Sequence, residues 1–117
     1  MRGRAVRIKI RESGQVTILG ISGKLMGGTD ADTFRDLIHQ LIESGKKRVL
    51  VDLASVKWVN STGVGILITG YTTMRRNKGD MKLLNVSNKI QSILYVTKLN
   101  LIFECFDDQD EAIASFS

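Results

Sequence analysis

A run of small polar residues, Asn60 to Gly63, has the side chains best suited to chemistry in this 117-residue chain. The hydroxyl residues Ser61 and Thr62 lie between two apolar runs, and Gly63 and Gly65 interrupt the second run. A hydroxyl at the start of a helix can cap it by accepting hydrogen bonds from first-turn N–H groups. It can equally carry a phosphate, because those N–H groups and the helix dipole favour an anion.

Capping alone accounts for one polar residue here, but not for the glycines. Asn60 or Ser61 would each make a good N-cap. Within a helix, Gly63 and Gly65 would each cost roughly 0.5–1 kcal/mol relative to alanine. The pair therefore indicates close approach of another surface, or a backbone that must stay accessible. A phosphate, with a charge of about −1.5 to −2, could act at an interface by placing a dianion opposite a docked partner.

No other stretch has the pattern of a catalytic or metal-binding site. The single histidine and single cysteine, His39 and Cys105, cannot form a Cys/His metal site. His39 is predicted in mid-helix near its outward side, without an obvious carboxylate or nucleophile partner, which is typical of a surface histidine. We therefore expect no enzymatic activity, no metal and no cofactor.

Two further segments resemble ligand sites superficially. The segment GISGKL, residues 20–25, has too few residues between its glycines for a phosphate-binding loop, and Leu25 stands where Ser or Thr would bind magnesium. The carboxylates of Asp30, Asp32 and Asp36 lie near a predicted helix start, where negative charge is favourable for structural reasons alone.

Composition indicates one domain, residues 1–117. Hydrophobic residues make up 43% and charged residues 25% of the chain, as in ordinary globular proteins. No apolar run approaches the length that spans a bilayer, and no signal-peptide apolar region follows the N-terminus. We therefore expect a cytoplasmic protein without membrane insertion, and the single cysteine agrees with a reducing compartment.

The net charge of +5 is concentrated at the start of the chain. The cations there are Arg2, Arg4, Arg7, Lys9 and Arg11. From Val6 on they alternate with apolar residues, which is the period of a half-buried strand. They form either a solvated strand face or a docking surface for an acidic partner or nucleic acid. Because no aromatic residues interleave with them, we expect no direct nucleic-acid binding.

Apolar periodicity predicts an α/β fold with the order β-β-α-β-α-β-α-β-α. The predicted strands are Val6–Arg11, Gln15–Ile21, 48–53, Met81–Val86 and Leu101–Cys105. The predicted helices run from Asp30 to Ser44, from Ser61 or Thr62 to about Met74, from a cap at Asn88, and from Asp107 or Asp108. Gly45 and Gly79 are stop signals, and residues 23–28 and 54–60 are interpreted as connections. The order predicts a mixed, mostly parallel sheet with helices mainly on one face.

Taken together, these features resemble the STAS domain family, in particular its small stand-alone bacterial anti-sigma factor antagonists. The resemblance covers about Ala5 to Phe116 and implies a single STAS-like domain. It rests on the hairpin start and on an ordered set of segments: GKL at 23–25, VLVDL at 49–53, VKWVNSTGVGIL at 56–67, GDMKLLNVS at 79–87 and KLNLIF at 98–103.

In that family the loop usually reads Asp-Ser-Ser/Thr-Gly, and its first hydroxyl is phosphorylated by a GHKL-type serine kinase that is also an anti-sigma factor. The unphosphorylated antagonist binds this partner and frees the sigma factor, phosphorylation blocks binding, and a PP2C-type phosphatase reverses it. The resemblance implies Ser61 as phosphoacceptor. It also implies a partner-binding surface, flanked by the helix from Thr62 to about Met74 and by the loop of residues 23–29. Its residues are Lys24, Met26, Asn60, Ser61, Thr62, Gly63 and Val64.

Two residues depart from the family pattern. Asn60 stands where the family usually has Asp, and Met26 stands where an Asp commonly follows the Gly-x-Leu segment. Both changes remove negative charge beside the acceptor serine, while Asn60 keeps the capping geometry. The resemblance then implies either constitutive partner binding or a divergent kinase.

Two functions of different classes follow from the resemblance. The first is an antagonist switched by phosphorylation at Ser61. The second is a STAS accessory subunit of a membrane ABC transporter for lipids, which predicts no phosphate transfer to Ser61. Nucleic-acid binding through the basic hairpin ranks last, because no recognition motif accompanies the cations.

Overall fold

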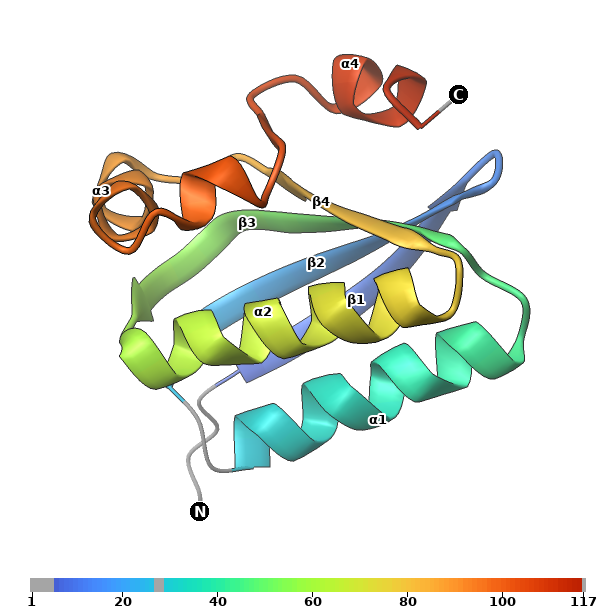
Figure 1. The fold of residues 1–117 in the computed structure, drawn as a ribbon, viewed down its shortest axis with the longest axis horizontal. Helices are drawn as coiled ribbons and strands as arrows, with labels where there is room; N and C mark the ends of the chain where they lie inside the picture. Colours follow the sequence, from blue (N-terminus) through green and yellow to red (C-terminus); the bar gives the residue numbers. More distant parts are fainter. Residues whose placement is uncertain (1–5, 27–28, 117) are drawn as a thin grey trace.

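A five-stranded mixed sheet forms the centre of the computed structural model, which describes residues 6–26 and 29–116. The strands are β1 (Val6–Ser13), β2 (Val16–Leu25), β3 (Arg48–Val59), β4 (Asp80–Leu84) and β5 (Cys105–Phe106), in that spatial order (Figure 1). The helices are α1 (Thr29–Glu43), α2 (Ser61–Arg76), α3 (Asn88–Val96) and α4 (Gln109–Ala114), with a 3-10 helix η1 (Leu99–Leu101) after α3. The predicted mixed α/β fold is confirmed.

Strand direction determines where the helices begin. β1 and β2 form an antiparallel hairpin, with Gly14 at a positive φ of 61° in the turn. The β2–β3, β3–β4 and β4–β5 pairs are parallel. The carboxyl ends of β2, β3 and β4 therefore lie at one edge of the sheet, and α1, α2 and α3 follow them from that edge. This edge is called the carboxyl edge below.

The helices divide unequally between the two faces of the sheet. α1 and α2 lie side by side on one face, and α4 lies on the other (Figure 1). The main core cluster contains buried residues of α1, α2 and α3, such as Phe34, Leu67 and Leu94. A smaller cluster joins Ala112 of α4 to Ile18 and other strand residues.

A buried lysine fastens α4 to its face of the sheet. Lys82 of β4 is only 5% exposed. Its Nζ donates to the backbone oxygen and to Oγ of Ser115, both at 2.9 Å, and pairs with the Glu104 carboxylate at 3.2 Å. These partners compensate the buried charge.

The connections predicted at residues 23–28 and 54–60 are largely wrong, because β2 and β3 continue to pair. Their parallel register runs from Thr17 opposite Val49 to Leu25 opposite Val59, with two irregularities. The irregularities break the alternation of apolar residues, which is why the pattern concealed the strand. Residues 27 and 28 lie outside the described residues.

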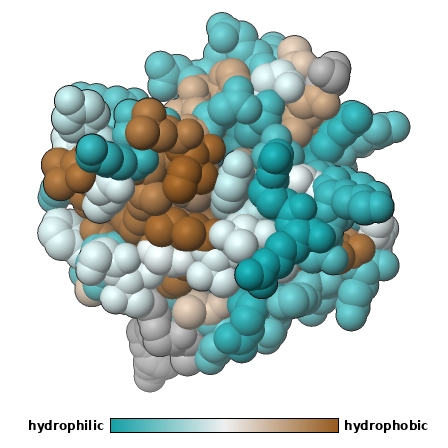
Figure 2. All heavy atoms as spheres, viewed as in Figure 1, coloured by the Kyte–Doolittle hydropathy of each residue, from teal (hydrophilic) through white to brown (hydrophobic). Residues whose placement is uncertain are grey.

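The last strand exists but lies later than the predicted Leu101–Cys105, with which it shares only Cys105. Lys98 takes a left-handed φ of 64° after α3, and the chain then forms η1, so that the strand pairing with β4 is only Cys105–Phe106. Figure 2 shows hydrophobic residues gathered over α3 and η1. The exposed large apolar side chains of this segment are Tyr95, Val96, Leu101 and Ile102.

The residues that cap and end the helices are the predicted ones or lie within one position of them. Gly45 ends α1 at a φ of 80°, as predicted. After α2, Lys78 takes the left-handed conformation, and the Gly79 N–H donates to the Met74 carbonyl at 2.8 Å. Ser87, rather than Asn88, caps α3, and Asp108 caps α4.

The two glycines in the first turns of α2 have different environments. A Cβ on Gly63 would overlap the carbonyl oxygen of Leu25 and lie 2.8 Å from Cγ2 of Val59. A Cβ on Gly65 would meet no atom within 4 Å. Gly63 is therefore required because the start of α2 contacts the ends of β2 and β3, whereas packing within the described chain does not require Gly65.

We predict opposite effects of alanine at these two positions. Gly63→Ala should lower the free energy of unfolding by about 2 kcal/mol or more, because the new methyl group overlaps backbone. Gly65→Ala should raise it by roughly 0.5–1 kcal/mol through helix propensity. Urea denaturation of both variants beside the wild type measures the difference, and similar effects at the two sites would contradict this packing.

Candidate functional site

The start of α2 is capped by Asn60, not by a hydroxyl residue. Asn60 has an extended backbone, with φ −110° and ψ −176°, and its Oδ1 accepts from the Gly63 N–H at 2.8 Å. Its carbonyl accepts from the Val64 N–H at 3.0 Å. The amide of Asn60 thus satisfies one of the N–H groups that an uncapped helix would leave unpaired.

Ser61 is free of that structural task. It is the first residue of α2 and is exposed, as is Thr62. The first turn of a helix favours an anion, so a phosphate on this hydroxyl would meet the positive end of the helix dipole. The helix can therefore carry a modified Ser61 without giving up its cap.

The end of β2 lies beside this helix start. Lys24 and Met26 are exposed, Met26 to 40%, while Leu25 between them is buried. The Leu25 carbonyl is the group that approaches Gly63, so these residues lie next to the first turn of α2.

A buried carboxylate holds that strand end in place. Asp30 is only 4% exposed, and its Oδ2 accepts from the Met26 N–H at 3.2 Å. α1 begins at Thr29, so Asp30 lies in the first turn rather than before it as predicted. Its side chain joins the chain before α1 to the helix itself.

The predicted site residues therefore lie together but differ in exposure. Lys24, Met26, Ser61 and Thr62 are exposed, Asn60 is half-buried, and Gly63 and Val64 are buried. Val64, 3% exposed, belongs to the main core. The buried pair contributes by fixing the helix start rather than by offering side chains to a partner.

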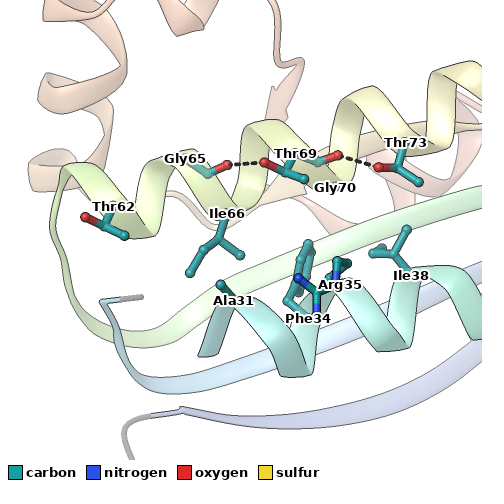
Figure 3. Close-up of a pocket in the computed structure, with 10 residues that line it drawn as sticks. All are labelled: Ala31, Phe34, Arg35, Ile38, Thr62, Gly65, Ile66, Thr69, Gly70 and Thr73. Atoms are coloured by element: carbon teal, nitrogen blue, oxygen red, sulfur yellow. Dashed lines mark hydrogen bonds between the residues drawn. The ribbon is translucent and has the colours of Figure 1, made fainter. Parts of the chain in front are cut away.

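A groove of about 390 Å³ opens between α1 and α2 and reaches Thr62 (Figure 3). Apolar side chains, among them Phe34, Ile38 and Ile66, line it, together with Gly65. The open space beside Gly65 belongs to this groove. The presence of Gly65 within the predicted helix was a sequence signal for this groove. The sequence did not show that α1 forms the other wall of the groove.

Most polar groups around the groove are already bonded. Oγ1 of Thr69 donates to the Gly65 carbonyl at 3.0 Å, and Oγ1 of Thr73 donates to the Thr69 carbonyl at 2.8 Å. Arg35 pairs with Asp32 at 3.0 Å. The groove has the chemistry of an apolar contact surface rather than of a catalytic centre.

Other reactive groups do not form a second site in the part of the chain that the structure describes. Burial raises the pKa of the Cys105 thiol, and the negative charge of Asp107 raises this pKa further, which disfavours the thiolate nucleophile. No group of His, Cys, Asp and Glu residues within 6–26 and 29–116 could hold a metal ion. No helix among these residues is both long and apolar enough to cross a bilayer. His39 is exposed.

Sequence reasoning missed Trp58 and Lys89 as neighbours of this site. Trp58 is the penultimate residue of β3, pairs in register with Lys24, and is 41% exposed. The Nζ of Lys89, from α3, lies 4.3 Å from the centroid of its ring. Placing residues 54–60 in a connection concealed this neighbourhood, because strand register is what brings Trp58 to the carboxyl edge.

Solved structures with this fold include anti-sigma factor antagonists and a transporter family protein. An anti-sigma factor antagonist from Mycobacterium paratuberculosis superposes with a TM-score of 0.81 at 17% identity, covering 96% of this chain and 94% of that one. The phosphorylated Bacillus cell fate determinant SpoIIAA gives 0.73 at 17% identity, covering 95% and 100%. A sulfate transporter family protein from Wolinella succinogenes gives 0.75 at 22% identity, covering 88% and 85%.

At these identities the likeness to solved structures shows a shared fold. The family assignment comes from a match to the sequence model of the STAS domain, which extends over residues 7–112. That match covers the five strands, except for Val6 at the start of β1, and it includes the start of α2, so the chain belongs to the STAS domain family.

Proposed function

We propose that this chain is an anti-sigma factor antagonist that docks on its partner through the start of α2 and is switched by phosphorylation of Ser61. The partner is an anti-sigma factor that is also a GHKL-type serine kinase, and a PP2C-type phosphatase removes the phosphate. Both partners act in the cytoplasm, and the chain itself performs no catalysis and binds no nucleic acid. One observation carries the proposal: Asn60 caps α2, which leaves the Ser61 hydroxyl exposed at the first position of the helix.

The switch is an electrostatic change at an interface. Oγ of Ser61 attacks the γ-phosphorus of kinase-bound ATP, the bond to ADP breaks, and the hydroxyl proton passes to a base of the kinase. The product carries a charge of about −1.5 to −2 at a helix start that tolerates it. A partner seated there would have to desolvate the dianion, so the phosphorylated form is released.

The neutral residues beside Ser61 define what the kinase must recognise. Asn60 and Met26 stand where the family usually has acidic residues, and Asp30 is buried. A cognate kinase therefore has to recognise the serine through shape and through other contacts.

A second candidate is an accessory subunit of a membrane ABC transporter for lipids. The likeness to a sulfate transporter family protein supports a transporter context, and the neutral loop fits a protein that needs no phosphorylation. This candidate docks on an ATPase subunit through the same helix start, and Ser61 then never receives phosphate.

A negative charge at position 61 should weaken partner binding, whereas loss of the Ser61 hydroxyl should leave binding nearly unchanged. Ser61→Asp should weaken binding to the cognate kinase about tenfold or more, because it places a negative charge in the interface. Ser61→Ala should bind within about twofold of the wild type, because the hydroxyl performs no capping. Isothermal titration of both variants measures this, and equal affinities would refute the switch while leaving docking intact.

Substitutions of the N-cap residue Asn60 should show how much its hydrogen bond stabilises the fold, and whether an added charge at this position changes that stability. Asn60→Ala should lower the free energy of unfolding by about 1 kcal/mol, since the Gly63 N–H loses its acceptor. Asn60→Asp should keep the wild-type stability, because a carboxylate accepts the same bond. Thermal unfolding at neutral pH compares the variants, and unchanged stability of Asn60→Ala would mean that the cap contributes nothing.

A further inference from the structure

We propose that Trp58 is the anchor of the docking surface beside Ser61, and that the partner receives it in an apolar socket bordered by carboxylates. This inference rests on the proposed function, because it specifies the partner that binds at the same site. It concerns residues that line no part of the groove between α1 and α2.

Trp58 lies at the carboxyl edge, in continuity with the start of α2. It pairs with Lys24, and the following residue, Val59, pairs with Leu25, whose carbonyl approaches Gly63. Two residues, Val59 and Asn60, separate Trp58 from Ser61. A partner that covers Ser61 and extends along the end of β3 would reach the indole ring as well.

The ring is unusually exposed for its type. Trp58 is 41% exposed, and Met26, at the end of the strand paired with β3, is 40% exposed. Large apolar side chains left in water at one edge mark an interaction surface. Tryptophan is among the residues most enriched where binding energy concentrates, because it buries much area with few rotatable bonds.

A cation from another element holds the ring. Nζ of Lys89, at the start of α3, lies 4.3 Å from the ring centroid. This contact joins β3 to α3 and restricts the rotation of the indole before any partner arrives. An anchor held in place loses less conformational entropy on binding.

Lysines flank Trp58 on the elements next to it. Lys24, Lys57 and Lys89 are exposed on the ends of β2 and β3 and at the start of α3. Between residues 53 and 103 the sequence has a single carboxylate, Asp80. Asp80 begins β4 opposite Arg48, at the far edge of the sheet.

This distribution identifies the occupant. A second copy of the chain docked through the same residues would bring lysines against lysines. The complement is a protein surface with an apolar socket for the indole and carboxylates opposite the lysines. Such a partner also explains release by phosphorylation, because the phosphate on Ser61 would meet those carboxylates as a like charge.

The test titrates the purified cognate kinase with the full-length chain and four variants. Trp58→Ala should raise the dissociation constant about 30-fold. Lys89→Glu should raise it about fivefold, mainly through slower association, and the effect should shrink in high salt. The matched controls Tyr95→Ala and Lys98→Glu, an exposed aromatic and a lysine beyond the end of α3, should stay within about twofold.

A spectroscopic readout reports directly on the anchor. Trp58 is the only tryptophan of the chain, so subtracting the spectrum of the complex formed by Trp58→Phe isolates its emission. Complex formation should shift this emission to the blue and protect it from iodide quenching. Circular dichroism of each variant verifies that the fold is retained.

The outcomes separate this inference from the proposed function. If the wild type binds the kinase but Trp58→Ala binds within twofold, the anchor is wrong and the proposed function stands. If the wild type binds no kinase, both are wrong. Binding of the wild type to phosphatidylglycerol vesicles or to a single-stranded oligonucleotide, lost in Trp58→Ala, would overturn the acidic protein partner in favour of a different occupant.

Discussion

The contact between the first turn of α2 and the end of β2 is the constraint on which the site depends. Gly63 lets the helix approach the Leu25 carbonyl, and the Asn60 amide accepts from the Gly63 N–H at 2.8 Å. Together these two interactions determine the direction and the start of the helix. Ser61 then occupies the first helical position with its side chain exposed, and its hydroxyl is not needed for the fold.

The parallel sheet extends this local arrangement into a surface. Because β2, β3 and β4 end at one edge, the chain brings Met26, just after β2, to the same edge as Trp58 of β3, Ser61 of α2 and Lys89 of α3. Ligand sites of open α/β sheets occur at that edge for the same geometric reason. At the ends of β2 and β3 and the start of α3 the exposed side chains of Lys24, Met26, Trp58 and Lys89 are apolar or cationic, which suits recognition of a protein surface and gives a phosphate on Ser61 a strong electrostatic effect.

The elements that could be predicted are those signalled by residues close together in the sequence. The hairpin formed by the first two strands, the end of α1 at Gly45 and the start of α2 near Ser61 are signalled by neighbouring residues, and they were predicted. The continuation of β3 to Val59 depends on pairing with β2, and η1 depends on the left-handed turn at Lys98, so the periodicity of single segments could not show them.

Among the site residues, the polar run at Asn60 and Ser61 was visible in the sequence. The contact of Lys89 with Trp58 was not, because it joins residues of two elements that only the folded sheet brings together.

The most direct test of the central claim is whether Ser61 accepts phosphate. The wild type and Ser61→Ala are each incubated with the cognate kinase and ATP, and their intact masses are measured. We expect the wild type to gain the mass of one phosphate and Ser61→Ala to gain none. An unmodified wild type, or equal phosphorylation of both proteins, would contradict it.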